Sequence, residues 1–351
     1  MEKAIESLMN QGFNFSFKQQ GVVKGLELSL DDAVAICKEC GLTTFKERFN
    51  NRCVVISVAN LKGGVTKSSS TVHLGHALRT HKNRISDDLS ILVIDLDPQA
   101  SATMFLNREF AINDLDSSSI QALFHDLTFD ELMADFIQPS QISGVDVMPA
   151  SINDGFVASQ LMQICASEPT LKDKNPLLLL KEHVIDKLRD HYDIILIDNG
   201  PHIDPLLQNT LCAVDVLLTP VPPSRVDYHS TVKYLIGLPN LYELINQNEQ
   251  LVNPSIPNFG YMTKYVDGKK DHELIRKSAK QIFGSGNFIE RPIPKLDGFE
   301  RCGERFQTVI SEGASTYEGS AKALNNAKNA AYIFAEDVFG KIETLLEDEG
   351  I

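Results

Sequence analysis

A glycine-rich stretch with two lysines, Asn-Leu-Lys-Gly-Gly-Val-Thr-Lys-Ser-Ser at residues 60–69, has the residue types that bind phosphate. It lies between an apolar run and a segment with helical spacing. Glycines let backbone N–H groups turn inward, and a helix N-terminus adds its dipole. In such a loop Lys67 would reach the β- and γ-phosphates of a nucleotide, and the Ser68 hydroxyl would bind Mg²⁺. The match to G-x-x-x-x-G-K-[ST] is poor because Leu61 and Thr66 replace its glycines, so a plain glycine turn is the alternative.

Three aspartates follow two other apolar runs. Asp95 and Asp97 come after Ile-Leu-Val-Ile, and Asp198 comes after Asp-Ile-Ile-Leu-Ile. Ligands of α/β sheets bind beyond the carboxyl ends of the strands, so all three should face the phosphate loop. A magnesium nucleotide needs a carboxylate to hold the metal and a group to orient the attacking water. Helix capping would explain one such aspartate, but three beside a glycine–lysine loop predict a nucleotide site.

The elements that position these groups alternate between strands and helices. Near-continuous apolar runs are typical of buried parallel strands. Helical stretches between them indicate βαβ units and a parallel sheet with helices on both faces. We expect strands at 53–60, 91–96, 194–198 and 214–220, weaker ones at 144–149 and 258–262, and helices at 69–81 and 320–346.

The first fifty residues have a different texture. Residues 1–10 suit a short helix, and aromatic and β-branched residues around glycines at 13–28 suggest a hairpin. A second helix should start at the N-cap candidate Ser29 and end at Gly41. Its apolar face would consist of Leu30, Ala33, Val34 and Cys37. Because this segment has few large apolar groups, it would be only marginally stable alone, and we expect it to pack against the main body.

Length and composition limit the possible functions. The chain has 351 residues, a formal net charge of −14 and a pI of about 5.1, which suits two domains or one large α/β domain with an appendage. No apolar run is long enough to span a membrane, and the N-terminus lacks the apolar stretch of a signal peptide. The six scattered cysteines should be reduced thiols. We therefore expect a cytoplasmic protein without a membrane partner.

The negative charge argues against nucleic acid as a partner, but it is unevenly distributed. Residues 260–310 hold ten Lys or Arg against seven Asp or Glu, a local charge of +3, so the other 300 residues carry −17. Phosphate contacts are local, and one basic face would suffice for them. Arg276, Lys277 and Lys280 lie at helical spacing and are candidates for duplex DNA contacts, with a solvated helix face as the alternative.

The phosphate loop resembles a specific family. Lys62-Gly-Gly-Val-Thr-Lys67-Ser68 is similar to the deviant Walker A motif, K-G-G-x-x-K-[ST], of the ParA/MinD family. The resemblance implies that Lys67 binds phosphate in cis and that Lys62 reaches the nucleotide of the other subunit in a homodimer. It also implies that Asp97 positions the hydrolytic water, that Ser68 and Asp198 form the magnesium site, and that Asp95 lies near the nucleotide. The remaining loop contacts would come from Gly63, Gly64, Val65, Thr66 and Ser69.

Within this family the chain most resembles plasmid and prophage partition ATPases that carry an N-terminal extension. The resemblance covers about residues 51–340 and includes NLKGGVTKS, DLDPQASATMFL, GVDVMPASI, DNGPHID and KLDGFERCGERFQTVI. It implies a doubly wound, mostly parallel P-loop NTPase that hydrolyses ATP to ADP slowly with Mg²⁺. The ATP-bound dimer would bind DNA nonspecifically until a ParB-type adaptor stimulates hydrolysis. Arg301 matches a DNA-contact position, and Arg305 lies four residues on. Met262-Thr-Lys and residues 220–223 would lie near the base and ribose.

The N-terminus departs from the subgroup, whose members usually carry a longer segment with a helix-turn-helix. We therefore divide the chain into an extension at 1–50, either a remnant winged helix-turn-helix or a dimerisation arm, and an ATPase domain at 51–351. A MinD-like positioning ATPase is one alternative, although the acidic tail 342–351 would be repelled by anionic lipid. Another is a repressor of its own operon that uses nucleotide as corepressor.

The cysteines favour neither zinc, redox nor iron–sulfur chemistry. Cys37-x-x-Cys40 has no second pair at zinc-site spacing. The iron proteins of the same superfamily need cysteines that bridge a dimer cluster, and Cys165, Cys212 and Cys302 show no sign of that.

Overall fold

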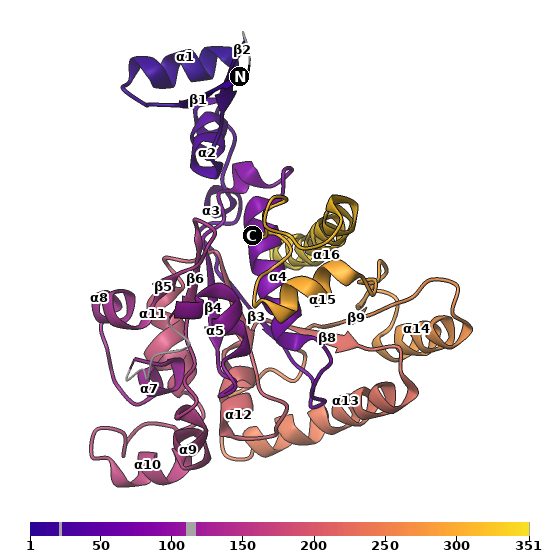
Figure 1. Cartoon of the computed structure of the whole chain (residues 1–351). Helices are drawn as coiled ribbons and strands as arrows, with labels where there is room; N and C mark the ends of the chain where they lie inside the picture. The colour runs from indigo at the N-terminus through magenta and orange to yellow at the C-terminus, as the bar shows by residue number, and fades with distance from the viewer. Residues whose placement is uncertain (21–22, 110–116, 351) are drawn as a thin grey trace.

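The computed structural model describes residues 1–20, 23–109 and 117–350, and its centre is an eight-stranded sheet (Figure 1). The strand order is β10-β9-β8-β3-β7-β4-β6-β5, and only β5 runs antiparallel to its neighbour. The mostly parallel α/β sheet that the sequence predicts is therefore confirmed. The strands are β3 (Val54–Val58), β4 (Ile91–Asp95), β5 (Gln138–Pro139), β6 (Val145–Met148), β7 (Ile194–Asp198), β8 (Val216–Val221), β9 (Asn258–Met262) and β10 (Phe288–Ile289).

Helices cover both faces of the sheet, which explains the continuous apolar runs. Along β3, Val54, Ile56 and Val58 join one core cluster, and Val55 joins the other. Successive side chains of a strand point to opposite faces, so both must be apolar here. The first cluster includes α4 (Lys67–Thr80), α5 (Ser101–Leu106), α15 (Asp297–Glu304) and α16 (Ala321–Asp348), and the second includes α7 (Ser119–Leu123), α12 (Pro205–Ala213) and α13 (Arg225–Ile245).

The sheet brings together the ends of the three strands that carry the site. β7 lies between β3 and β4, and Asp198 is in register with Val58 on one side and with Asp95 on the other. All three strands are parallel, so the loops that follow them leave from the same edge. The phosphate loop and the two acidic turns are therefore neighbours, as predicted.

The N-terminal segment contains the predicted elements. These are α1 (Glu2–Asn10), an antiparallel hairpin of β1 (Ser16–Gln20) and β2 (Val23–Glu27), and α2 (Leu30–Glu39), and they lie beyond one end of the main body in Figure 1. Ser29 caps α2 in a reciprocal capping box with Asp32. Of the predicted apolar face, Val34 is buried and the other three residues are partly buried, and Ile36 is the second buried residue of this helix.

This segment has its own small core and polar contacts to the main body. Ala4, Leu8, Phe15 and Ile36 form a separate apolar cluster. Toward the main body, the Lys38 ammonium lies 2.6 Å from an Asp88 carboxylate oxygen. In the described part of the chain, no helix is long and apolar enough to cross a membrane.

Helix α3 (Phe45–Arg48) packs against the main body. Phe45 is 0% exposed and Phe49 is 4% exposed, and both lie in the core cluster that contains α16. The end of the first fifty residues thus packs against the main body as expected, whereas residues before α2 pack on one another. The boundary at residue 50 remains a prediction.

We predict that Phe45→Ala lowers the free energy of unfolding of the main body by about 3–5 kcal/mol, because it leaves a cavity in a closed core. Urea denaturation followed by circular dichroism measures this loss. Leu42→Ala, three residues earlier at a side chain that is 52% exposed, is the matched control and should change stability by less than about 0.5 kcal/mol. Equal stabilities for the two variants would contradict the packing of α3.

Candidate functional site

The phosphate loop connects β3 to α4, which begins at Lys67, two residues earlier than predicted. Gly64 has a φ of +74° and Thr66 a φ of +73°, both in the left-handed region. Glycine adopts this region freely, but a β-branched threonine does so only at a cost in strain. Thr66 therefore holds the backbone shape for which the ordinary motif uses glycine, and strain of this kind is concentrated at functional sites.

Side chains from the loop and its neighbours fix its path. The Asn60 amide donates to the Pro220 carbonyl and to the Thr231 hydroxyl, both at 2.9 Å, and its oxygen accepts from the Lys62 N–H at 3.0 Å. The Lys67 ammonium donates across the loop to the Lys62 carbonyl at 3.3 Å. The loop thus closes around the Lys67 side chain.

Asp198 is a buried carboxylate without a partner. Its side chain is 0% exposed, and neither oxygen accepts a hydrogen bond from the residues that the structure describes. Burial, and after it the charge of Asp95, raise the pKa of Asp198 well above its usual range, although Ser68 and Lys67 oppose this shift. Burying an unpaired charge is costly, so this arrangement suits a site completed by a cation.

Asp95 has a different environment from Asp198. One of its oxygens accepts from the Asp97 N–H at 3.1 Å, and the other accepts from the N–H and hydroxyl of Thr103 at 2.8 and 2.7 Å. Burial raises the pKa of Asp95 to about 7 against these hydrogen bonds. Because both oxygens hold the turn that follows β4, Asp95 fixes the position of Asp97.

Asp97 and Asp198 both face Lys67. Burial lowers the pKa of Lys67, and the charges of Asp198 and Asp97 oppose the shift. Asp97 is partly buried, accepts from the Gln99 N–H at 3.0 Å and lies beside Gly200, where an added Cβ would be 3.8 Å from its carboxylate. The structure thus brings together the lysine and the two carboxylates that the sequence predicts, whose roles remain predictions.

The residues around Asp198 fit Mg²⁺, but they do not enclose it. Within the described ranges, no group of three His, Cys, Asp or Glu side chains is placed to hold a metal ion. The hard oxygen of Asp198 and the Ser68 hydroxyl are suitable ligands. Mg²⁺ commonly takes one or two carboxylates and completes its coordination with phosphate oxygens and water, so an incomplete protein cage is expected for it.

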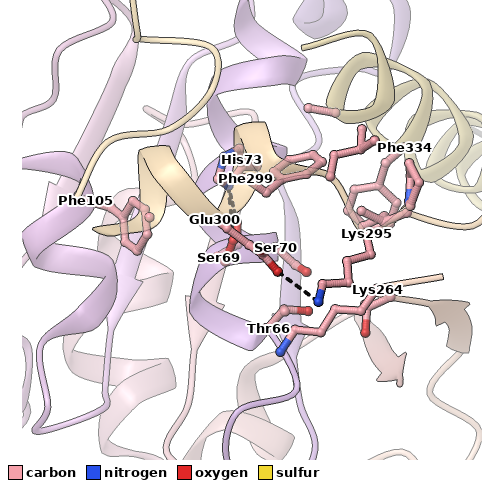
Figure 2. A pocket seen from close by; sticks show the side chains of 16 residues that line it. Thr66, Ser69, Ser70, His73, Phe105, Lys264, Lys295, Phe299, Glu300 and Phe334 are labelled. Carbon is pink, nitrogen blue, oxygen red and sulfur yellow. Dashed lines mark hydrogen bonds and ion pairs between the residues drawn. The ribbon is translucent and has the colours of Figure 1, made fainter. Parts of the chain in front are cut away.

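A cavity of about 250 Å³ opens beside the phosphate loop (Figure 2). Ser69, Ser70 and His73 line it from α4, and Phe299 lines it from α15. The His73 ring is fixed, because Nδ1 lies 2.6 Å from the Ser69 carbonyl and Nε2 accepts from the Val309 N–H at 3.0 Å. Burial lowers the pKa of His73 to about 4, so the ring is neutral at pH 7.

Only part of this cavity was predicted from the sequence. Within the stretch Met262-Thr-Lys that was expected near the base, Met262 is 0% exposed and packs in an apolar cluster with Val221 and Phe288, so its side chain does not line the space. The other two residues of this stretch, Thr263 and Lys264, do line it. His73 and Phe299 were not predicted to line it, because no local motif marks them as cavity residues.

The candidate DNA-binding residues differ in exposure and in whether their side chains already form an ion pair or hydrogen bond within the chain. On α14 (Lys270–Phe283), Arg276 and Lys280 both pair with Glu290, whereas Lys277 is exposed. The Arg305 guanidinium donates to the Thr316 carbonyl at 2.9 Å. Arg301 is exposed on α15. Arg301 and Lys277 are therefore the best placed for phosphate contacts.

Lys62 lies at the rim of the site. Its ammonium is 3.7 Å from an Asp227 oxygen at the start of α13, and its side chain is 41% exposed.

All six cysteines are free thiols, and Cys37 is partly buried while Cys40 is exposed.

Comparisons with known proteins agree with this geometry. A family model described as an AAA domain matches residues 53–257. Plasmid partition protein A of Escherichia coli is 43% identical over 343 residues, which cover 98% of this chain and 85% of that protein. The sporulation initiation inhibitor protein Soj of Bacillus subtilis is 25% identical over 277 residues, covering 77% and 97%.

Solved structures give the same result. A partition protein superposes with a TM-score of 0.80 at 36% identity and covers 98% of this chain and 86% of its own. A putative plasmid partition protein of Borrelia burgdorferi, solved with AMPPNP, has a TM-score of 0.55 at 20% identity over 81% and 99%, which shows a shared fold.

Proposed function

We propose that this chain, which belongs to the ParA family of plasmid partition ATPases, binds Mg²⁺-ATP at residues 62–69 and hydrolyses it to drive DNA segregation. The single observation that carries this proposal is the buried Asp198, whose oxygens have no partner among the described residues, beside the Lys67 ammonium. A buried carboxylate without a partner favours a cation, and a lysine at a glycine-rich loop favours an anion, so a magnesium nucleotide, which supplies both, fits this site.

The residues then have distinct tasks in phosphoryl transfer to water. Lys67 and the loop amides neutralise charge that develops on the transferred phosphate. Ser68 and Asp198 would hold Mg²⁺, which neutralises further phosphate charge. Asp97, held in place by Asp95, accepts a hydrogen bond from the attacking water and orients it. The nucleoside would occupy the cavity between Ser69, His73 and Phe299, whose apolar walls suit a purine.

The same edge of the sheet supports an ATP-dependent homodimer. Large apolar side chains are exposed in the segments that follow β6, β7 and β8: Ile152 is 74% exposed, Phe156 77%, Ile203 59% and Val226 72%. An exposed apolar rim of this kind usually marks an association site. Because Lys62 lies at this rim, pairing two such edges would bring it toward the second nucleotide.

DNA binding and adaptor stimulation complete the proposal. Arg301 offers a phosphate contact on α15, whose inner residue Phe299 lines the nucleoside cavity. An acidic chain with one weak basic face binds poorly alone, and two faces in a dimer bind better. A ParB-type adaptor would act on the ATP-bound dimer by stimulating its hydrolysis.

The test compares retention of nonspecific duplex DNA by the wild type with ATP and with ADP, together with the ATPase rate. We expect retention only with ATP. Arg301→Ala should weaken binding to every sequence and lower the salt slope by about one, because one phosphate contact is lost. Lys172→Ala, at an exposed lysine between α10 (Leu161–Ser167) and β7, is the control and should behave as wild type. Absence of ATP-dependent retention at any salt concentration would refute the DNA-binding role.

A further inference from the structure

Lys264 contacts the phosphate loop from outside the loop. Its ammonium donates a hydrogen bond to the Gly64 carbonyl at 3.0 Å. Figure 2 shows its side chain running from the segment after β9 to a position beside Thr66. Gly64 is the loop glycine with positive φ, so this contact is made at the point where the loop turns.

A rigid turn holds Lys264 in this position. The Thr263 N–H donates to the Val221 carbonyl at 3.1 Å, and the Tyr265 N–H donates to the Ile293 carbonyl at 3.0 Å. The Tyr265 carbonyl in turn accepts from the Lys295 N–H at 2.8 Å. Lys264 itself has a φ of +51°, a conformation that non-glycine residues keep only when their surroundings impose it.

Two lysines therefore hold two carbonyls of the phosphate loop. Lys67 binds the Lys62 carbonyl and Lys264 binds the Gly64 carbonyl. A phosphate-binding loop must turn its N–H groups toward the anion, and a carbonyl that rotated inward would repel it. To reach a phosphate, Lys67 must release its carbonyl, whereas Lys264 approaches from the nucleoside side and need not move.

We propose that Lys264 is a positioning residue that holds the phosphate loop in its nucleotide-binding shape. This inference rests on the proposed nucleotide site and adds a residue outside the Walker-type motif. Lys264 acts by preorganisation, which lowers the cost of ordering the loop when nucleotide binds. At saturating ATP the bound nucleotide itself orders the loop, so Lys264 contributes to affinity and has little effect on the chemical step.

The variant that tests this is Lys264→Gly, because glycine accepts the positive φ and removes only the side chain. We expect the Kd for ATP and for ADP to rise about tenfold, the value of one charge-assisted hydrogen bond. KM should rise in parallel, while kcat changes by less than about twofold. Lys264→Arg should keep Kd within about threefold of wild type. The Tm of nucleotide-free Lys264→Gly should not fall below that of the wild type.

Lys264→Met and Lys270→Met complete the experiment. The first keeps the strained backbone and should match Lys264→Gly in affinity. The second removes an exposed charge from the same segment without a contact to the loop, and its Kd should equal that of wild type. A wild-type Kd for Lys264→Gly, a fall in kcat with KM unchanged, or an equal loss in Lys270→Met would each overturn the inference. A wild-type protein that neither binds nor hydrolyses ATP would instead refute the proposed function.

Discussion

Replacing Asp198 by asparagine is expected to make the nucleotide-free protein more stable while it abolishes activity. The carboxylate is 0% exposed and unpaired among the described residues, and its pKa is raised even though Lys67 lies nearby. The ionised form is therefore disfavoured by its surroundings, and a neutral side chain of the same shape removes that cost. We expect the free energy of unfolding at pH 7 to rise by about 1–3 kcal/mol, measured by urea denaturation without nucleotide.

The same substitution should remove the effect of Mg²⁺ on nucleotide binding. In the wild type, Mg²⁺ should tighten ATP binding and EDTA should reverse this. In Asp198→Asn we expect affinity with Mg²⁺ to fall about 10–100-fold, the usual cost of disturbing a metal site. Calorimetric titration of ATP with and without Mg²⁺ measures this difference.

Asp193→Asn is the matched control for Asp198→Asn. Asp193 is also buried, directly precedes the same strand, and burial raises its pKa to about 6. One of its oxygens accepts from the Ser90 N–H at 2.7 Å. Asp193 and Ser90 directly precede β7 and β4, so they lie at the amino ends of these strands, away from the phosphate loop. Its replacement should leave Mg²⁺-dependent binding unchanged. If Asp193→Asn lost this dependence, or if Asp198→Asn kept it, Asp198 would not be part of a metal site.

The central strands and the phosphate site were predictable because each depends on a short stretch of sequence. A strand buried on both faces must be apolar at every position, so β3, β4 and β7 appear as unbroken runs. The carboxyl ends of parallel strands meet at one edge, so Asp97 and Asp198 could be placed opposite Lys67 without coordinates. The edge strands β5 and β10, with two residues each, are too short to leave a pattern.

Features that combine distant segments were not predictable in the same way. The cavity beside the phosphate loop is lined by α4, α15, α16 and the segment after β9, and no local motif indicates that these segments meet. Charge counts treated Arg276 and Lys280 as free, whereas both pair with Glu290, which follows α14 in the chain. In α13, Pro239 interrupts the helical pattern, yet burial of Leu238 and Leu241 stabilises a helix of 21 residues around it.

Lys62→Met is expected to prevent ATP-dependent dimerisation while the monomer still binds nucleotide. In the monomer, the Lys62 ammonium lies 3.7 Å from an Asp227 oxygen, and both side chains are partly exposed. Exposed ion pairs of this kind contribute about 0–1 kcal/mol. The side chain is therefore free to leave for a stronger anion. The contact from Lys67 is to the Lys62 carbonyl, so the substitution leaves it intact. We expect nucleotide Kd to stay within about threefold and hydrolysis to fall about 100-fold, as when one stabilising cation is lost.

Sedimentation equilibrium with a non-hydrolysable ATP analogue separates dimer formation from turnover. Wild type should form a dimer, and Lys62→Met should remain monomeric at the same concentration. Lys233→Met, at an exposed lysine of α13, controls for the loss of one positive charge and should dimerise. Asp227→Asn releases Lys62 from its partner within the subunit and should dimerise at least as well as wild type. If Lys62→Met formed the dimer normally but hydrolysed ATP slowly, Lys62 would act within its own subunit, and the apolar rim alone would account for association.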